Sequence, residues 1–220
     1  MENRRRFLES ALALFAGISI WVSPFFSFLQ VAFGEAKKIV LPKGTPRETL
    51  IDKNPATLDA RNLEITPLDR FGTMGLSDHR EDLKKWRLEI KGQVKNPLKL
   101  TYGEITALNA VQRDVLLICP GFFANYGMWK GVSIAELFKM AKADEGVTQV
   151  TVRGPEGKYG MVKDFKMEDV LSDKVFLAYE VNGKPLPEEH GFPLRIVAEG
   201  YYGFDWVKYV CTVTAEKIES

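Results

Sequence analysis

Residues 115–138 read VLLICPGFFANYGMWKGVSIAELF, and this stretch places a cysteine at the end of a predicted strand. The four apolar residues before Cys119 have the length and character of a buried strand. Pro-Gly, two phenylalanines and a polar segment follow, which we expect to form a loop before a helix begins near Ser133. A thiol in this position is either a small core residue or a ligand held at the end of a rigid element.

The composition is that of an ordinary globular protein. The chain has 220 residues, 45% hydrophobic and 27% charged, which is enough to bury a sizeable core. Its 30 basic and 29 acidic residues nearly cancel, so the charge does not indicate a nucleic-acid partner. HExxH, GxSxG and P-loop patterns are absent, and two cysteines are too few for a four-cysteine iron–sulfur cluster. Any redox reaction would use one centre and exchange electrons with another protein.

The N-terminus differs from the rest of the chain. Residues 4–8 read RRRFL, and no charged residue occurs from position 10 to 34. A basic head followed by an apolar body indicates an export signal, and the RRRFL run resembles the twin-arginine motif. We expect residues 1–34 to be a twin-arginine signal peptide or to remain as a membrane anchor. The protein would then work in the periplasm or elsewhere outside the cytoplasm, after passing the twin-arginine export machinery.

The remaining sequence predicts more strands than helices. Residues 35–67 are rich in Pro, Lys, Asp and Asn and predict an extended arm, whereas residues 68–220 form the main domain. No βαβ alternation runs through the chain, so the fold class is mixed, strand-rich α+β. Asn182-Gly183 is a strong hairpin signal. The segments predicted as strands are WRLEI, LKL, VLLIC, VTQVTVRG, KVFLAYEVNG and two in the tail PLRIVAEGYYGFDWVKYVCTVTAEKI.

Two helices are expected. Residues 101–104 and 133–136 each have the pattern of a capping box, with Thr or Ser followed three positions later by Glu. On the second helix, the residues predicted to face the core are Ile134, Leu137, Phe138 and Ala141.

The residues themselves leave three roles open for Cys119. It could pair with Cys211 in a disulfide, as exported proteins with two cysteines often do, remain an inert thiol, or act as a ligand or nucleophile. The local sequences of the two cysteines differ. Cys119 ends a strand at a glycine-containing loop, where a ligand can approach the backbone. Cys211 lies within the apolar alternation WVKYVCTV, as a core residue would.

A second group of candidate residues lies near the C-terminus. His190, Arg195 and Lys208 are interleaved with glycines. Three basic side chains among glycines can surround a phosphate, with arginine as a bidentate fork and lysine as a point charge. Composition alone favours the simpler interpretation, in which Arg195 and Lys208 are solvated strand residues and His190 is a loop residue.

These segments resemble a known family. Three of them carry the similarity, in this order: WxGV after the strand-end cysteine, AYEVNGKPLPEEHGFPLRIV, and YGFDWVKYV. They are similar to the molybdopterin-binding oxidoreductase domain of the sulfite oxidase superfamily, in its periplasmic, twin-arginine-exported, single-domain form. The similarity runs from about Leu68 to the C-terminus. It implies a sulfite-oxidase-type fold and a molybdenum–molybdopterin (Mo-MPT) cofactor that is inserted before export.

The resemblance also implies roles for individual residues. Cys119 matches the thiolate that binds molybdenum, and a soft thiolate suits a high-valent metal. Arg70 is a candidate cofactor-binding cation by analogy. The residues that match those around the pterin phosphate, which needs a cationic cradle, are His190, Arg195 and Lys208.

The sequence departs from sulfite oxidases where substrate would bind. Those enzymes carry an arginine soon after the cysteine, whereas CPGFFANYGMW has no cation before Lys130. Arg113 is a further candidate cation by analogy. The aromatic residues expected to line a pocket beside the metal, or else to pack in the core, are Phe122, Phe123, Tyr126 and Trp129.

The sequence therefore predicts an exported molybdopterin-dependent oxidoreductase. It would move an oxygen atom to or from a small substrate, as the periplasmic methionine sulfoxide reductases of this fold do. Electrons would be exchanged with a separate haem protein, either soluble or membrane-bound. The alternatives are a cofactor-free binding protein that kept the fold and a membrane-anchored structural subunit whose cysteines are paired.

Overall fold

The computed structural model describes residues 37–218, and a compact unit begins at Lys38. The predicted signal peptide or anchor at residues 1–34 lies outside the described residues. Among the helices of residues 37–218, none is long and apolar enough to cross a membrane.

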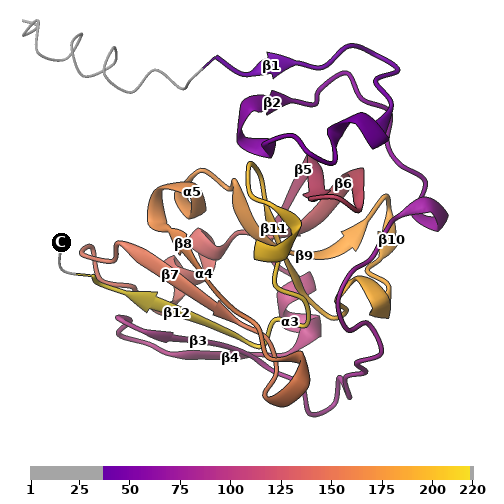
Figure 1. Cartoon of the computed structure of the whole chain (residues 1–220). Coiled ribbons are helices and arrows are strands. Elements are labelled where there is room, and N and C mark those ends of the chain that lie inside the picture. Colours follow the sequence, from indigo (N-terminus) through magenta and orange to yellow (C-terminus); the bar gives the residue numbers. More distant parts are fainter. Residues whose placement is uncertain (1–36, 219–220) are drawn as a thin grey trace, which may run out of the picture. The chain divides into compact units, whose positions relative to one another are not determined.

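Two five-stranded sheets form the framework (Figure 1). In the first sheet, the strand order is β10–β9–β6–β5, and β11 also pairs with β9. Its strands are β5 (Ala110–Cys119), β6 (Phe123–Val132), β9 (Val175–Val181), β10 (Lys184–Pro185) and β11 (Arg195–Ala198). In the second sheet, the order is β4–β3–β12–β7–β8, with β12 parallel to β3. Its strands are β3 (Leu88–Gly92), β4 (Leu98–Leu100), β7 (Gln149–Arg153), β8 (Val162–Lys166) and β12 (Thr212–Glu216).

Short helices and turns connect the strands. The α-helices are α3 (Tyr102–Thr106), α4 (Ile134–Ala141) and α5 (Met167–Leu171). The 3-10 turns are η1 (Arg47–Leu50), η2 (Pro55–Thr57), η3 (Leu68–Arg70), η4 (Gly157–Tyr159), η5 (Glu188–His190) and η6 (Gly203–Asp205). This strand-rich α+β architecture confirms the fold class predicted from the sequence. β8 and α5 lie where we expected no element.

The two expected helices begin where the sequence predicts. Thr101 caps α3 by accepting a hydrogen bond from the Glu104 amide, and the Glu104 carboxylate accepts one from the Thr101 amide, at 3.2 and 2.8 Å. At α4, Ser133 Oγ accepts from the Glu136 amide at 3.3 Å, which is one half of a capping box. The buried residues of α4 are the four predicted ones, Ile134, Leu137, Phe138 and Ala141.

The stretch after Cys119 is a strand, and our expectation of a loop there was wrong. β5 and β6 pair antiparallel from Cys119↔Phe123 to Ala110↔Val132. Gly121 adopts a φ of +75°, which permits the tight reversal. The strand escaped detection because β6 is buried on both faces, so the alternation of apolar and polar residues that marks a half-exposed strand is missing.

The segment before the main domain covers one face of this hairpin. It contains two short parallel strands, β1 (Ile39–Val40) and β2 (Leu58–Asp59), and the turns η1 and η2. Its apolar side chains form a cluster with residues of β5 and β6. The buried members are Leu41, Leu50, Leu58 and Leu63 from the segment, and Leu116, Ile118, Ala124 and Tyr126 from the hairpin. With its other face in the main core, the hairpin gives Cys119 a rigid support.

We expect Leu137→Ala to lower the free energy of unfolding by about 2–5 kcal/mol, because Leu137 is fully buried on α4 and its truncation leaves a cavity. Met140 lies on the same helix but is 42% exposed, so Met140→Ala should cost less than about 0.5 kcal/mol. Urea unfolding of the two variants checks this difference, and equal losses would contradict the packing described for α4.

Candidate active site

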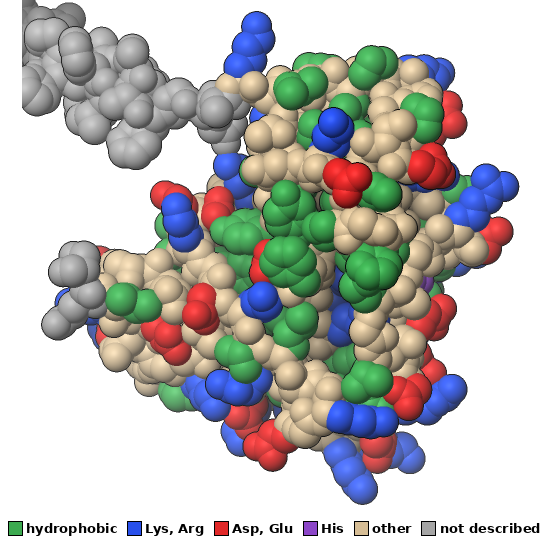
Figure 2. Space-filling view, in the orientation of Figure 1, with side chains coloured by type: hydrophobic (Ala, Val, Ile, Leu, Met, Phe, Trp, Pro, Cys, Tyr) green, Lys and Arg blue, Asp and Glu red, His purple; other side chains and the backbone are tan. Residues whose placement is uncertain are grey.

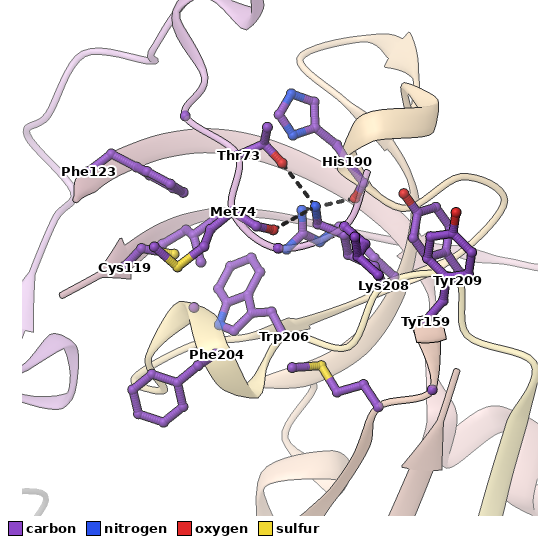
Figure 3. Close-up of a pocket in the computed structure, with 18 of the residues that line it drawn as sticks. Thr73, Met74, Cys119, Phe123, Tyr159, His190, Phe204, Trp206, Lys208 and Tyr209 are labelled. Carbon is purple, nitrogen blue, oxygen red and sulfur yellow. Dashed lines mark hydrogen bonds between the residues drawn. The ribbon is translucent and has the colours of Figure 1, made fainter. Parts of the chain in front are cut away.

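One cavity of about 370 Å³ brings together the cysteine and the three basic side chains singled out in the sequence (Figure 3). Cys119 lines it from the end of β5, and Arg195 from the start of β11. His190 ends η5, and Lys208 lies between η6 and β12. The rest of the wall comes from residues 72–76, from residues 158–161, and from Leu117, Phe123, Gly203, Phe204, Trp206 and Tyr209.

The surroundings of Cys119 are apolar. In the close-up, Cys119, Phe123 and Phe204 lie on one side, whereas Lys208 lies on the other (Figure 3). Burial raises the pKa of the Cys119 thiol, and the nearby charges of Arg195 and Lys208 oppose this shift. The two cysteines are free in this structure, without the disulfide that composition alone allowed.

The backbone of η6 passes directly over the sulfur of Cys119. A Cβ atom at Gly203 would collide with Cys119 Sγ and would lie 3.0 Å from a methyl carbon of Leu117. Only a glycine lets the backbone approach this closely. The position of the sulfur is therefore set by the end of β5 on one side and by η6 on the other.

Arg195 is a buried cation without a carboxylate partner among residues 37–218. Its guanidinium lies 5.1 Å from the ring centre of Trp129 and 5.4 Å from that of Trp206. Its hydrogen bonds go to backbone carbonyls, from Nη1 to His190 O at 3.0 Å and from Nε to Ile196 O at 3.4 Å. Burial lowers the pKa of Arg195 to about 10, so the group stays charged at neutral pH.

Two further basic groups flank Arg195. The Lys208 ammonium donates to Thr73 Oγ1, Met74 O and Glu189 O at 2.9, 3.0 and 2.8 Å. Its burial, followed by the charge of Arg195, lowers its pKa to about 8. The same causes lower the pKa of His190 to about 4, so its imidazole is neutral at pH 7.

The cavity fits an anionic ligand that carries hydrogen-bond acceptors. Arg195 supplies a buried positive charge that no carboxylate of the described residues neutralises. Trp206 also lines the cavity, and its buried Nε1 has no hydrogen-bond partner in the described part of the chain. A phosphate-bearing cofactor would satisfy both groups.

The other predicted cations do not reach the cavity. Arg70 ends η3 on the surface and is not among the lining residues, so its assignment as a cofactor-binding residue remains a prediction without support from this geometry. Arg113 pairs with Glu199, and Lys130 pairs with Glu180 at 3.1 Å.

Of the four aromatic residues expected beside the metal, only Phe123 lines the cavity. Phe122 points to solvent, and Tyr126 packs under the segment 38–67. Trp129 is buried behind Arg195, where its ring contacts the guanidinium. The aromatic wall exists, but the residues that complete it, which sequence reasoning missed, are Tyr159, Phe204, Trp206 and Tyr209.

Sequence reasoning also missed the wall formed by residues 72–76. The only local signal was the pair of glycines in FGTMG, which suits a backbone that approaches a ligand. At the mouth of the cavity, Met74, Leu76 and Phe204 are 40%, 47% and 51% exposed. Figure 2 shows hydrophobic side chains gathered around a hollow in this face of the molecule, with basic atoms visible within it.

Comparison of the sequence with known proteins finds a family of oxidoreductase domains and several oxidoreductases. Residues 76–220 match the model of the family described as oxidoreductase molybdopterin binding domain. The uncharacterized oxidoreductase YuiH of Bacillus subtilis is 30% identical over 131 residues, which are 59% of this chain and 65% of YuiH. The NADH nitrate reductase of Volvox carteri is 29% identical over 164 residues, 61% of this chain and 19% of that protein. The chain thus spans less than two thirds of these relatives.

The solved structure of the sulfane dehydrogenase SoxCD from Paracoccus pantotrophus resembles this fold. The TM-score is 0.59 at 24% sequence identity, over 64% of this chain and 40% of the SoxCD chain. At this level of identity the likeness concerns the fold alone.

Gly203→Ala should disturb the cysteine, because the added Cβ collides with Cys119 Sγ. We expect the free energy of unfolding to fall by about 1–3 kcal/mol, as for other overpacked sites, and the native-state alkylation rate of Cys119 to change. Gly103→Ala is the matched control, since a Cβ there meets no atom within 4 Å and α3 favours alanine. Urea unfolding and mass spectrometry of the alkylated Cys119 peptide measure both quantities. Equal behaviour of the two variants would contradict the close approach of η6.

Proposed function

The chain belongs to the family of oxidoreductase molybdopterin-binding domains, as the sequence resemblance implied, and on this premise we propose that it is an exported oxygen-atom-transfer enzyme. The cofactor of this family is molybdenum–molybdopterin. The substrate would be a small neutral molecule of the sulfoxide class, and electrons would be exchanged with a separate haem protein.

One observation carries the proposal. Cys119 is distant in the sequence from Arg195 and Lys208, and all three line the same cavity. Cys119 would supply one thiolate to the metal, and Arg195 would hold the anionic end of the pterin. Trp206 Nε1 offers a further donor. When bound, the cofactor supplies the two-electron chemistry, while the residues of the chain bind it, orient it and exclude water.

The apolar side chains beside Cys119 favour a neutral substrate once the cofactor occupies Arg195. Leu117, Phe123 and Phe204 are apolar cavity side chains on the same side as the sulfur. Arg113 and Lys130 are both engaged by carboxylates, so neither is available to hold sulfite or nitrate. With Arg195 occupied by the cofactor, an anion would meet an apolar surface, which disfavours it.

The balanced reaction requires two electrons and two protons. In the reductive direction, a sulfoxide takes up both and becomes a thioether, with the sulfur–oxygen bond broken and the oxygen released as one molecule of water. The electrons would come from the haem protein, soluble or membrane-bound. The exposed rim of Met74, Leu76 and Phe204 leaves the cavity accessible to such a partner.

The RRRFL run at residues 4–8 supports export through the twin-arginine machinery and a role for the protein in the periplasm.

Cys119→Ser tests the metal assignment. The volume hardly changes, so we expect a folded protein that has lost most of its molybdenum and all turnover. Cys211→Ser is the control: Cys211 donates to the carbonyl of Gly154 at 3.1 Å and is not among the lining residues, so this variant should keep its metal. Elemental analysis of protein that was produced with its export pathway measures the molybdenum content per protein chain. Full metal content in Cys119→Ser would refute the ligand role, and absence of metal in the wild type would favour a cofactor-free binding protein.

The substrate class can be tested with reduced methyl viologen as electron donor. We expect kcat/KM for dimethyl sulfoxide or methionine sulfoxide to exceed that for nitrate by about tenfold or more, because Arg195 would hold the cofactor and Lys208 gives its three N–H donors to oxygens of the chain. Arg113 and Lys130 are engaged by carboxylates, so none of these four cations would be free to hold nitrate. For sulfite oxidation with ferricyanide as electron acceptor, we expect kcat/KM to be as low as for nitrate reduction. A preference for either anion would overturn the proposal of a neutral substrate while leaving the family assignment intact.

A further inference from the structure

The wall formed by residues 72–76 is held to the framework at two places. The first is the side chain of Asn125, a buried residue of β6. Its Oδ1 accepts from the Gly72 amide at 3.2 Å, and its Nδ2 donates to the Gly72 carbonyl at 3.1 Å. Both polar groups of Gly72 are therefore paired with one carboxamide, which fixes the point where this segment enters the cavity wall.

The second place is Lys208. Its ammonium donates to Thr73 Oγ1 and Met74 O in the wall, and to Glu189 O in η5 (Figure 3). A lysine ammonium has three N–H donors, and three oxygens within 3.0 Å match that number. The Thr73 hydroxyl also donates to Glu189 O at 3.1 Å. Lys208 thus joins residues 72–76 to the 188–191 turn.

The turn is shaped to accept this lysine. Gly191 has a φ of +107°, a conformation that side chains other than glycine rarely adopt. A Cβ at Gly191 would lie 3.0 Å from the Cβ of Lys208. The stem of Lys208 therefore packs against bare backbone, which directs its ammonium between the two loops.

Arg195, unlike Lys208, keeps N–H donors that are not used within the described part of the chain. Two of its hydrogen bonds go to backbone carbonyls, those of His190 and Ile196. A guanidinium has five N–H donors, so three remain for a ligand. The two cations of the cavity consequently differ in what they can offer to an anion.

We propose that Lys208 is a positioning residue, a latch that holds residues 72–76 against the 188–191 turn, while Arg195 supplies the charge that binds the anionic end of the cofactor. The inference deepens the proposed function and takes the identity of the ligand from it. The latch consists of groups of the protein chain alone, so it can be tested in protein without cofactor.

The test compares hydrogen–deuterium exchange of the full chain produced in a host that cannot make molybdopterin. In Lys208→Met the stem is kept and three hydrogen bonds are lost, so we expect the amides of residues 72–76 to exchange about tenfold faster or more. Thr73→Val removes one of these acceptors and the link to Glu189 without changing any charge, and should give a smaller increase in the same amides. Lys163→Met, which breaks the 2.9 Å pair between β8 and Asp205 of η6 and changes no residue that lines the cavity, is the control and should leave them unchanged.

If Lys208 only contacted the cofactor, its replacement would not change the exchange of residues 72–76 in protein without cofactor. Unchanged exchange of residues 72–76 in both Lys208→Met and Thr73→Val would overturn the latch. Retention of molybdopterin gives a second readout in loaded protein, where Thr73→Val should lose cofactor faster than Lys163→Met does. Because the exchange is measured without cofactor, its result stands independently of the metal analysis of Cys119→Ser, and the failure of one proposal can be told from that of the other.

Discussion

The site depends on a buried positive charge that no carboxylate of residues 37–218 neutralises. Burying a guanidinium costs several kcal/mol even after local relaxation. Here the rings of Trp129 and Trp206 and the carbonyls of His190 and Ile196 offset part of that cost for Arg195. The part of the cost that is not offset would be lowered by an anion bound next to the guanidinium. The two rings come from β6 and from the segment after η6. The packing that places these elements therefore also determines the surroundings of the Arg195 charge.

The same hairpin serves several parts of the site. β5 ends in Cys119, and β6 supplies Phe123 to the wall, Asn125 to the 72–76 segment and Trp129 to Arg195. Antiparallel pairing fixes all four residues relative to one another. A shift of one residue in register would turn each side chain to the opposite face. The cover of residues 38–67 on one face and the main core on the other make such a shift costly.

Local patterns predicted the parts of the fold that depend on neighbouring residues. The caps and inner face of α4, the strand before Cys119 and the Asn182 hairpin all follow from short-range periodicity and turn chemistry. β6 was missed because burial on both faces removes that periodicity. The wall at residues 72–76 was missed because its anchors, Asn125 and Lys208, are far away in the sequence. The four site residues that do line the cavity were candidates from their local sequence, and the family resemblance selected their roles among those left open. Arg70, chosen by analogy without a motif, does not reach the cavity.

The separation of charge within the cavity constrains what can react beside Cys119. An anion entering from solvent is attracted toward Arg195, since its charge is buried and its guanidinium keeps N–H donors that the described residues do not use. If the cofactor occupies Arg195, its own negative charge cancels the attraction, and the apolar side chains of Leu117, Phe123 and Phe204 lie on the side of the cavity that holds the sulfur. A small uncharged molecule loses less hydration on entering such a space than sulfite or nitrate does. If Arg195 holds the cofactor as proposed, this cation therefore ceases to favour an anionic substrate once the cofactor is bound.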